Sequence, residues 1–242
     1  MIMITHQEKA LRKEMVDVCR RMNGTGLNQG TAGNMSVRLD SESCLITPSG
    51  IAYDSMVPEH LAVLWRDGLW TGPHRPSTEW RFHRDILAAR RDADVILHTH
   101  SRHATAVACL EQDLPTFHYM IAVAGGDSIR CAPYETFGTQ ELSDGALLSL
   151  KGRKACLLGH HGMIVLERTP ERALALAIEV EALCAIYLLA RTAGKLKAIG
   201  KAEIARVVKL FASYGTPDFP DDELVRLPAR HATASGAPAA SQ

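Results

Sequence analysis

Four histidines of this 242-residue chain stand in two short runs whose spacing suits a metal site. In VILHTH, His98 and His100 are two residues apart, so on a strand both side chains point to one face. Two neutral imidazoles can donate lone pairs to one divalent ion, although two hydrogen-bonded histidines at a strand end would have the same spacing. In LLGHHGM, His160 or His161 would supply a third ligand, and three protein ligands are usual at a catalytic zinc.

Three loops rich in small hydrogen-bond donors indicate a phosphate pocket. In the first, Ser77 and Thr78 precede Glu79 at the expected start of a helix, where free backbone N–H groups and the helix dipole favour an anion. Glu79 can serve as a general base beside that anion, whereas Ser77 alone is also a good helix N-cap. The other loops are residues 30–34 and 47–50, each of which would alone indicate only a tight turn.

The composition is that of a globular protein and argues against two classes of partner. Lys plus Arg and Asp plus Glu both number 27, so the formal net charge is zero and no global positive field attracts a nucleic acid. The most apolar stretch, residues 173–190, contains Glu179 and Glu181, whereas a membrane span needs about 20 nearly uncharged residues. We therefore expect neither a nucleic-acid partner nor a membrane anchor.

The cysteines and the N-terminal residues favour a cytoplasmic location. The six cysteines are scattered and no two have CxxC spacing, which predicts reduced thiols rather than disulfides or a zinc knuckle. The N-terminal run MIMITHQEKALRKEM has no long apolar core and no small-residue cleavage site, so a secretory signal is not expected.

Hydrophobic periodicity predicts helices and strands of a single α/β domain. Alternating or β-branched apolar runs predict strands at residues 35–39, 44–47, 61–65 and 95–100, and two more within 154–166. Helical spacing and capping residues predict helices at 5–24, 77–91, 102–110, 139–150, 169–192 and 201–214. We expect the domain to cover residues 1–215, and residues 216–242, rich in Pro, Ala, Ser and Asp, to form a flexible tail.

Seven motifs together resemble those of the class II aldolase/adducin family. They are GLNQGTAGNMSVR, LITPSGI, PSTEWRFH, DADVILHTHSRHATAV, FHYMIAVAGGDSI, CAPYETFGTQEL and LLGHHGMI, and the similarity extends from about Glu8 to Gly215. The resemblance implies a single-domain three-layer α/β/α sandwich with a central mixed, largely antiparallel sheet.

The resemblance implies a metal site with one Zn²⁺ per subunit, although another divalent ion such as Mn²⁺ or Co²⁺ stays open. Its three ligands match His98, His100 and His161. His160 occupies a position that is often asparagine in the family, so it is not expected to be a ligand. Glu79 matches a residue that can approach the vacant metal and then acts as the catalytic acid/base.

The resemblance also implies a phosphate site and an aromatic wall. The phosphate-binding positions match Gly33, Asn34, Ser49, Gly50, Ser77 and Thr78. Asn34 would also hydrogen-bond the enediolate. Tyr119 matches a catalytic proton donor that reaches the site from a neighbouring subunit, while Tyr214 and Phe137 match aromatic residues of the substrate pocket.

The reaction implied is the zinc-dependent cleavage of a ketose 1-phosphate of the L-fuculose 1-phosphate type, which yields dihydroxyacetone phosphate and a small aldehyde such as lactaldehyde. The alternatives are a 5-(methylthio)ribulose-1-phosphate or 5-deoxyribulose-1-phosphate aldolase, a pentulose-phosphate 4-epimerase and, least favoured, a non-catalytic adducin-like interaction module. A homo-oligomer is expected, in the form of a homotetramer with active sites shared between subunits.

Overall fold

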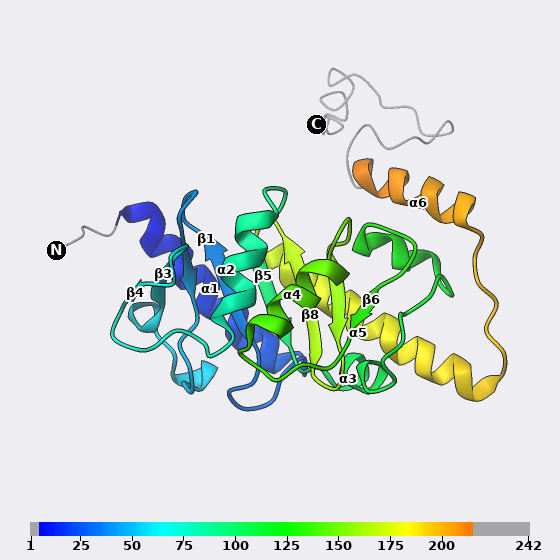
Figure 1. Cartoon of the computed structure of the whole chain (residues 1–242), viewed down its shortest axis with the longest axis horizontal. Coiled ribbons are helices and arrows are strands. Elements are labelled where there is room, and N and C mark those ends of the chain that lie inside the picture. Colours follow the sequence, from blue (N-terminus) through cyan, green and yellow to red (C-terminus); the bar gives the residue numbers. More distant parts are fainter. Residues whose placement is uncertain (1–4, 215–242) are drawn as a thin grey trace, which may run out of the picture.

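One eight-stranded sheet, in the order β4-β3-β2-β1-β5-β8-β7-β6, forms the centre of the computed structural model, which describes residues 5–214 (Figure 1). The strands are β1 (Asn34–Arg38), β2 (Ser43–Ile46), β3 (Ala62–Trp65), β4 (Trp70–Thr71), β5 (Val95–Thr99), β6 (Arg130–Ala132), β7 (Ala155–Leu158) and β8 (Gly162–Glu167). Neighbouring strands are antiparallel except for the parallel pair β6 and β7. The sheet is therefore mixed and largely antiparallel, as predicted.

Helices cover both faces of this sheet. The helices are α1 (His6–Gly24), α2 (Trp80–Ala89), α3 (Arg102–Ala108), α4 (Gln140–Ser149), α5 (Pro170–Ala193) and α6 (Lys201–Ser213), with the short 3₁₀ helices η1 (Tyr53–Ser55), η2 (Pro58–His60) and η3 (Tyr119–Ala124). Val95 and Leu97 of β5 pack in the core with α1, α3 and α5, while Ile96 between them packs with α2 and α4. This period-two alternation gives the sheet two buried faces and confirms the predicted three layers.

Most predicted elements lie within one or two residues of the observed ones, because their caps are local. Thr5 caps α1 by accepting a hydrogen bond from the Glu8 N–H at 3.1 Å. Thr169 caps α5 in the same way through Arg172 N–H at 3.3 Å, with Pro170 as its first residue. The short edge strands β4 and β6 and the 3₁₀ helices were not expected from the periodicity.

The start of α2 differs from the prediction. The sequence predicted a helix from Ser77, but α2 begins at Trp80, and Glu79 occupies the N-cap position. Ser77 N–H donates to the Thr47 carbonyl at 2.9 Å and Pro76 bridges to Pro48, so this segment is extended against the neighbouring loop. The Ser77 hydroxyl instead accepts the Glu79 N–H at 3.2 Å.

The predicted boundary at residue 215 and the predicted tail 216–242 fall outside the described residues, so the domain limits remain predictions. Among the described helices, α5 alone is long and apolar enough to cross a membrane by length and composition. It packs against β5, β8, α1 and α3, with Leu174, Val180 and Leu183 buried. In this fold α5 is a core helix.

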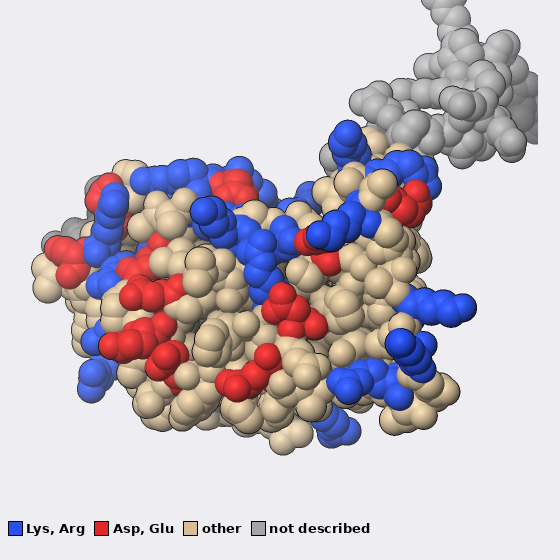
Figure 2. Space-filling model, turned by 45° about the vertical axis from the view of Figure 1, so that its right-hand side comes forward, with Lys and Arg blue, Asp and Glu red and all other residues tan. Residues whose placement is uncertain are grey.

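Both signs of charge occur on the face shown in Figure 2, separated by broad uncharged areas. Lys and Arg gather along the upper part of this face, and most of the Asp and Glu residues lie below them.

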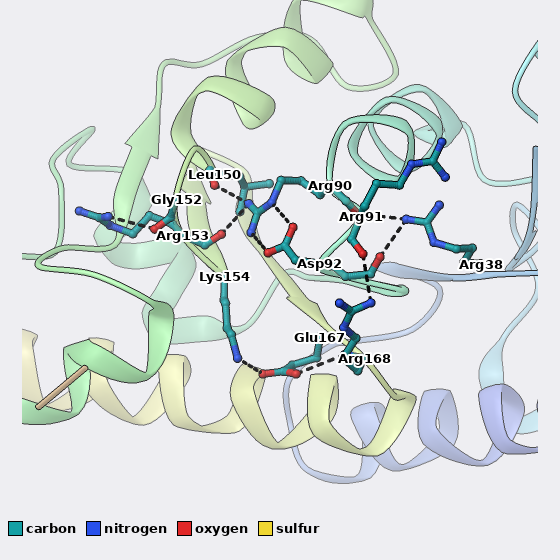
Figure 3. Close-up of polar contacts among 11 residues, drawn as sticks. Arg38, Arg90, Arg91, Asp92, Leu150, Gly152, Arg153, Lys154, Glu167 and Arg168 are labelled. Atoms are coloured by element: carbon teal, nitrogen blue, oxygen red, sulfur yellow. Dashed lines mark hydrogen bonds and ion pairs between the residues drawn. The ribbon is translucent and has the colours of Figure 1, made fainter. Parts of the chain in front are cut away.

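Ion pairs connect the ends of several central strands on one side of the sheet (Figure 3). Lys154, just before β7, pairs with Glu167 at the end of β8 at 2.8 Å. Arg168, which follows β8, pairs with Asp94 at 3.1 Å. Arg90, after α2, donates to the Leu150 carbonyl at 2.6 Å. These contacts hold helix ends and strand ends together where the ladder hydrogen bonds stop.

Arg38, at the end of β1, makes the densest set of these contacts. Its guanidinium pairs with Asp94 at 2.9 Å and donates to the carbonyls of Leu87, Arg90 and Ala93 at 2.8–3.0 Å. Its side chain is only 15% exposed. One side chain therefore joins β1, the end of α2 and the start of β5.

We predict that Arg38→Met destabilises the fold, because the methionine leaves partly buried carbonyls without a donor. The free energy of unfolding should fall by about 2 kcal/mol and the melting temperature by roughly 4–8 °C, as measured by thermal denaturation. Arg66→Met is the matched control, because Arg66 is 55% exposed and its ion pair with Glu42 is 4.0 Å long. Equal melting temperatures for the two variants would contradict this role of Arg38.

Candidate active site

Strand register brings four segments together at the sheet end opposite Arg38. Asn34, the first residue of β1, lies opposite His98 of β5, and Thr99 lies opposite Met163 of β8. The loop before β1, the residues after β5 and the turn before β8 therefore converge. The start of α2 adds Glu79 to the same place, as its hydrogen bond with Asn34 shows.

Glu79, His98, His100 and His161 form a tight cluster of potential metal ligands, whose donor atoms all lie within 4.8 Å of one another. His98 Nε2 is 2.9 Å from His100 Nε2. Glu79 Oε2 lies 3.2 Å from His98 Nε2, and Glu79 Oε1 lies 3.3 Å from His161 Nε2. Ligands around a tetrahedral zinc with bonds of about 2.0–2.1 Å would be about 3.3–3.4 Å apart, close to these separations.

The histidines of the cluster are held in the form that binds a cation. Burial lowers the pKa of His100 to about 3 and that of His161 to about 4, so both rings are neutral at physiological pH. His98 Nδ1 lies 2.9 Å from the Met163 carbonyl, which can only accept, so in neutral His98 the proton is on Nδ1 and Nε2 offers a lone pair.

Glu79 completes the donor set. Burial alone would raise its pKa, but His98, His161 and Asn34 more than offset this and hold the pKa of the carboxyl well below its usual range. Glu79 Oε1 has no hydrogen-bond partner within residues 5–214, although it is buried. A buried, ionised oxygen without a donor beside three histidines fits a divalent cation.

Backbone contacts fix the histidines. Asn28, which is 4% exposed, accepts the His100 N–H through Oδ1 at 2.7 Å. Gly33 lies close by with φ +72°, and a Cβ there would be 2.6 Å from the His98 carbonyl oxygen. Only glycine fits this approach of two backbones. Asn28 lies within a motif quoted above, but its spacing gave no indication that it would reach His100.

Glu181 of α5 fixes the segment that follows His100. Its carboxylate accepts hydrogen bonds from Ser101 Oγ at 2.6 Å and from the N–H groups of His103 and Ala104 at 2.9 and 2.8 Å. It thereby satisfies the free N–H groups at the start of α3. A carboxylate within an apolar helix was the available signal for this role, but from the sequence it indicated only that this stretch is not a membrane span.

A pocket of about 420 Å³ opens beside the cluster. All six residues expected to bind phosphate line it: Gly33, Asn34, Ser49, Gly50, Ser77 and Thr78. Phe137, Glu79, His100 and His161 line it too. Thr31, Ala32 and Pro48, which belong to the two predicted phosphate loops, line it as well. His160 lines it without having been expected as a ligand, and the lining residues Tyr134 and Glu135 were not predicted.

Tyr119 and Tyr214 lie elsewhere. Neither belongs to the lining of this pocket in the described part of the chain, and their side chains are 52% and 70% exposed. Tyr119 is the first residue of η3, and Tyr214 follows α6, which packs on η3. Within one chain the structure therefore separates these two residues from the other predicted site residues.

A cluster of three histidines and a glutamate beside a pocket lined by hydroxyls and backbone amides defines a candidate metalloenzyme site. The family described as Class II Aldolase and Adducin N-terminal domain matches residues 13–188. The chain therefore belongs to this family, which confirms the resemblance of its motifs. It is a class II aldolase, a metal-dependent lyase.

Two curated relatives and one solved structure illustrate the similarity. The chain is 47% identical over 206 residues to the 5-methylthioribulose-1-phosphate/5-deoxyribulose-1-phosphate aldolase of Rhodospirillum rubrum, covering 85% of this chain and 93% of the relative. It is 46% identical over 211 residues to the L-fuculose phosphate aldolase of Escherichia coli (strain K12), covering 86% and 97%. A solved L-fuculose 1-phosphate aldolase superposes with a TM-score of 0.81 at 35% identity, covering 84% and 96%.

We predict that replacing His98, His100 or His161 with alanine removes bound metal, because each loss leaves the cation short of one imidazole. Metal content should fall from about one equivalent per subunit to less than about 0.1 after dialysis, as measured by mass spectrometry of the metal. His160→Ala is the matched control, since it alters the adjacent histidine and should retain the metal. A fully metallated His161→Ala protein would show that His161 is not a ligand.

Proposed function

We propose that this chain is a zinc-dependent aldolase that cleaves a ketose 1-phosphate into dihydroxyacetone phosphate and a small aldehyde. The observation that carries the proposal is the Glu79, His98, His100 and His161 cluster, which adjoins a pocket lined by six candidate phosphate-binding residues. Zinc is preferred because a site of neutral imidazoles and one carboxylate suits it.

Two types of substrate fit this proposal about equally. The relative from Rhodospirillum rubrum, named for 5-methylthioribulose 1-phosphate and 5-deoxyribulose 1-phosphate, is 47% identical. The relative from Escherichia coli, named for L-fuculose phosphate, is 46% identical. These substrates share the phosphorylated end and differ in the aldehyde that is released. The second candidate function is therefore the same cleavage of a ketose 1-phosphate that releases a different aldehyde.

The phosphate end would lie against the loops that contain Ser49 and Ser77. The hydroxyls of Ser49, Ser77 and Thr78 and the backbone N–H of Gly50 border the pocket and can donate to phosphate oxygens. The pocket also adjoins the start of α2, whose dipole favours an anion. These contacts would fix the end of the substrate that does not react.

The reacting carbons would then face Glu79 and Asn34. A divalent cation held by the three histidines would supply Lewis-acid stabilisation of the negative charge that grows as the C3–C4 bond breaks. Cleavage would release the C4 hydroxyl proton as the aldehyde forms and add one proton to C3, so no net proton is consumed. Glu79 would take up a proton from solvent and deliver it to C3, the carbon that becomes part of dihydroxyacetone phosphate, and the Asn34 amide would donate to the adjacent oxygen. No lysine Schiff base is required.

We propose a homotetramer in which Tyr119 of one subunit serves the aldehyde oxygen at a neighbouring site, with Tyr214 closing over the substrate. The position of Tyr119 outside the pocket of its own chain supports this arrangement. A head-to-tail ring would repeat the same geometry at every interface.

We also propose a cytoplasmic location. The six cysteines are all free thiols in the structure, as is usual in a reducing compartment.

The proposed reaction is tested with a panel of ketose 1-phosphates, including L-fuculose 1-phosphate, 5-(methylthio)ribulose 1-phosphate and 5-deoxyribulose 1-phosphate. Release of dihydroxyacetone phosphate in a coupled assay should accompany loss of at least one of them, and removal of metal by a chelator should abolish it. Ranking kcat/KM across the panel selects the substrate. Recovery of an epimerised pentulose phosphate without free aldehyde would instead identify a 4-epimerase.

We predict that Glu79→Gln lowers kcat by about 10²–10⁴-fold, because the amide cannot take up or release the proton. The variant should keep its metal, since three imidazoles remain, and its affinity for the substrate should be unchanged. Proton exchange at the hydroxymethyl carbon of dihydroxyacetone phosphate, followed by NMR in deuterated water, isolates this step. Exchange at the wild-type rate would exclude Glu79 as the base.

We predict that Tyr119→Phe and Glu79→Gln subunits complement each other. Each homo-oligomer should be nearly inactive. Subunits of the two variants co-expressed one to one should recover about a quarter of wild-type activity. Random assembly around a ring places an intact Glu79 beside an intact Tyr119 of the neighbouring subunit at about that fraction of sites. Mixed assemblies no more active than the two parents would show that Tyr119 does not act across an interface.

A further inference from the structure

A chain of hydrogen bonds leads from the core of the sheet to Glu79. Ser36 Oγ lies 2.7 Å from His83 Nδ1, and His83 Nε2 lies 2.5 Å from Asn34 Oδ1. The Asn34 amide nitrogen then donates to Glu79 Oε2 at 2.9 Å. All four side chains are buried, and Ser36 and His83 have no exposed surface at all.

The carboxylate fixes the direction of every bond in this chain. Glu79 Oε2 can only accept, so the Asn34 NH₂ must face it and the Asn34 carbonyl oxygen must face His83. His83 must therefore carry its proton on Nε2, and Nδ1 accepts from the Ser36 hydroxyl. The other tautomer would turn the amide over and bring its oxygen against the carboxylate.

His83 can keep this arrangement because it stays neutral. Burial lowers the pKa of His83 to about 3. A neutral imidazole has one donor and one acceptor, which are the two groups that Asn34 and Ser36 require. His83 does not itself line the pocket and reaches it through Asn34, and it was not among the predicted site residues.

We infer that His83 is a positioning residue that locks the Asn34 amide, so that its NH₂ always faces Glu79 and the reacting end of the pocket. The inference rests on the proposed function, in which Glu79 and Asn34 handle the proton and the developing charge. Without the His83 donor, the Asn34 amide can rotate and present its oxygen to these groups. His83 should therefore affect the chemical step more than substrate binding.

The kinetic test compares His83→Leu with His83→Gln. Loss of the donor in His83→Leu should lower kcat by about 10–100-fold, with KM changed less than about twofold and metal content unchanged, as is typical when an outer-shell partner is lost. Glutamine can donate its amide N–H to Asn34, so His83→Gln should retain most of the wild-type kcat. Wild-type kcat in a metallated His83→Leu protein would overturn the inference. A folded and metallated His83→Gln protein with a kcat as low as that of His83→Leu would also overturn it.

Ser143→Ala is the control for a general loss of stability. Ser143 is fully buried in α4, and its hydroxyl donates to Asp85 at 2.7 Å, away from the pocket residues. Its removal should lower the melting temperature but leave kcat unchanged. A fall in kcat that simply follows melting temperature across Ser143→Ala and the His83 variants would mean a purely structural role.

Nitrogen-15 NMR of the histidine rings tests the tautomer without an activity assay. In the zinc-loaded wild-type protein, His83, assigned by loss of its signals in His83→Gln, should be protonated at Nε2 and not at Nδ1. An Nδ1–H tautomer overturns the inference even if the enzyme cleaves a ketose 1-phosphate. A protein that cleaves none of the panel while His83 is protonated at Nε2 would contradict the proposed function but support the locked amide.

Discussion

The antiparallel register of β1, β5 and β8 is the constraint on which the site depends. It sets Asn34 opposite His98 and Thr99 opposite Met163, so that His98, His100 and the turn with His161 meet at one sheet end. Side chains alternate along a strand, and a slip by one residue would turn His98 to the opposite face. Arg38 and its ion-pair partners join the opposite ends of the same strands. Salt bridges thus connect the strands at one end, and the register places the candidate metal ligands together at the other end.

Burial gives this site its chemical character. Desolvation lowers the pKa values of His100 and His161, which makes both rings ready ligands that need not release a proton first. The Glu79 carboxylate stays ionised in the same surroundings because His98, His161 and Asn34 contact it. Burial therefore favours neutral histidines, while specific contacts preserve one negative charge. A bound divalent cation would offset the negative charge of Glu79.

Sequence patterns could predict the parts of this site that depend on local spacing. His98 and His100 share a face because they are two residues apart, and Thr5 caps α1 through a bond to Glu8 three residues on. The contributions of Asn28 and Glu181 could not be predicted, because their partners lie 72 and about 80 residues away. The same kind of distant bond explains the wrong start of α2, where Thr47 holds the Ser77 N–H. The grouping of Glu79 and His161 with His98 and His100 came from the family resemblance, because sequence spacing alone could not predict it.

The candidate metal ligands and the exposed wall of the pocket belong to different parts of the fold. His98 and Asn34 lie on central strands, whereas Phe137 belongs to the loop between β6 and α4. This loop is fastened at Gly138, whose carbonyl accepts a hydrogen bond from Arg81 at 2.6 Å, and a Cβ on Gly138 would be 2.8 Å from the Thr78 carbonyl oxygen. The loop is thus anchored close to the phosphate residues while Phe137, 64% exposed, remains at the pocket mouth. A change of side chain at Phe137 would leave the strands that carry the candidate metal ligands undisturbed.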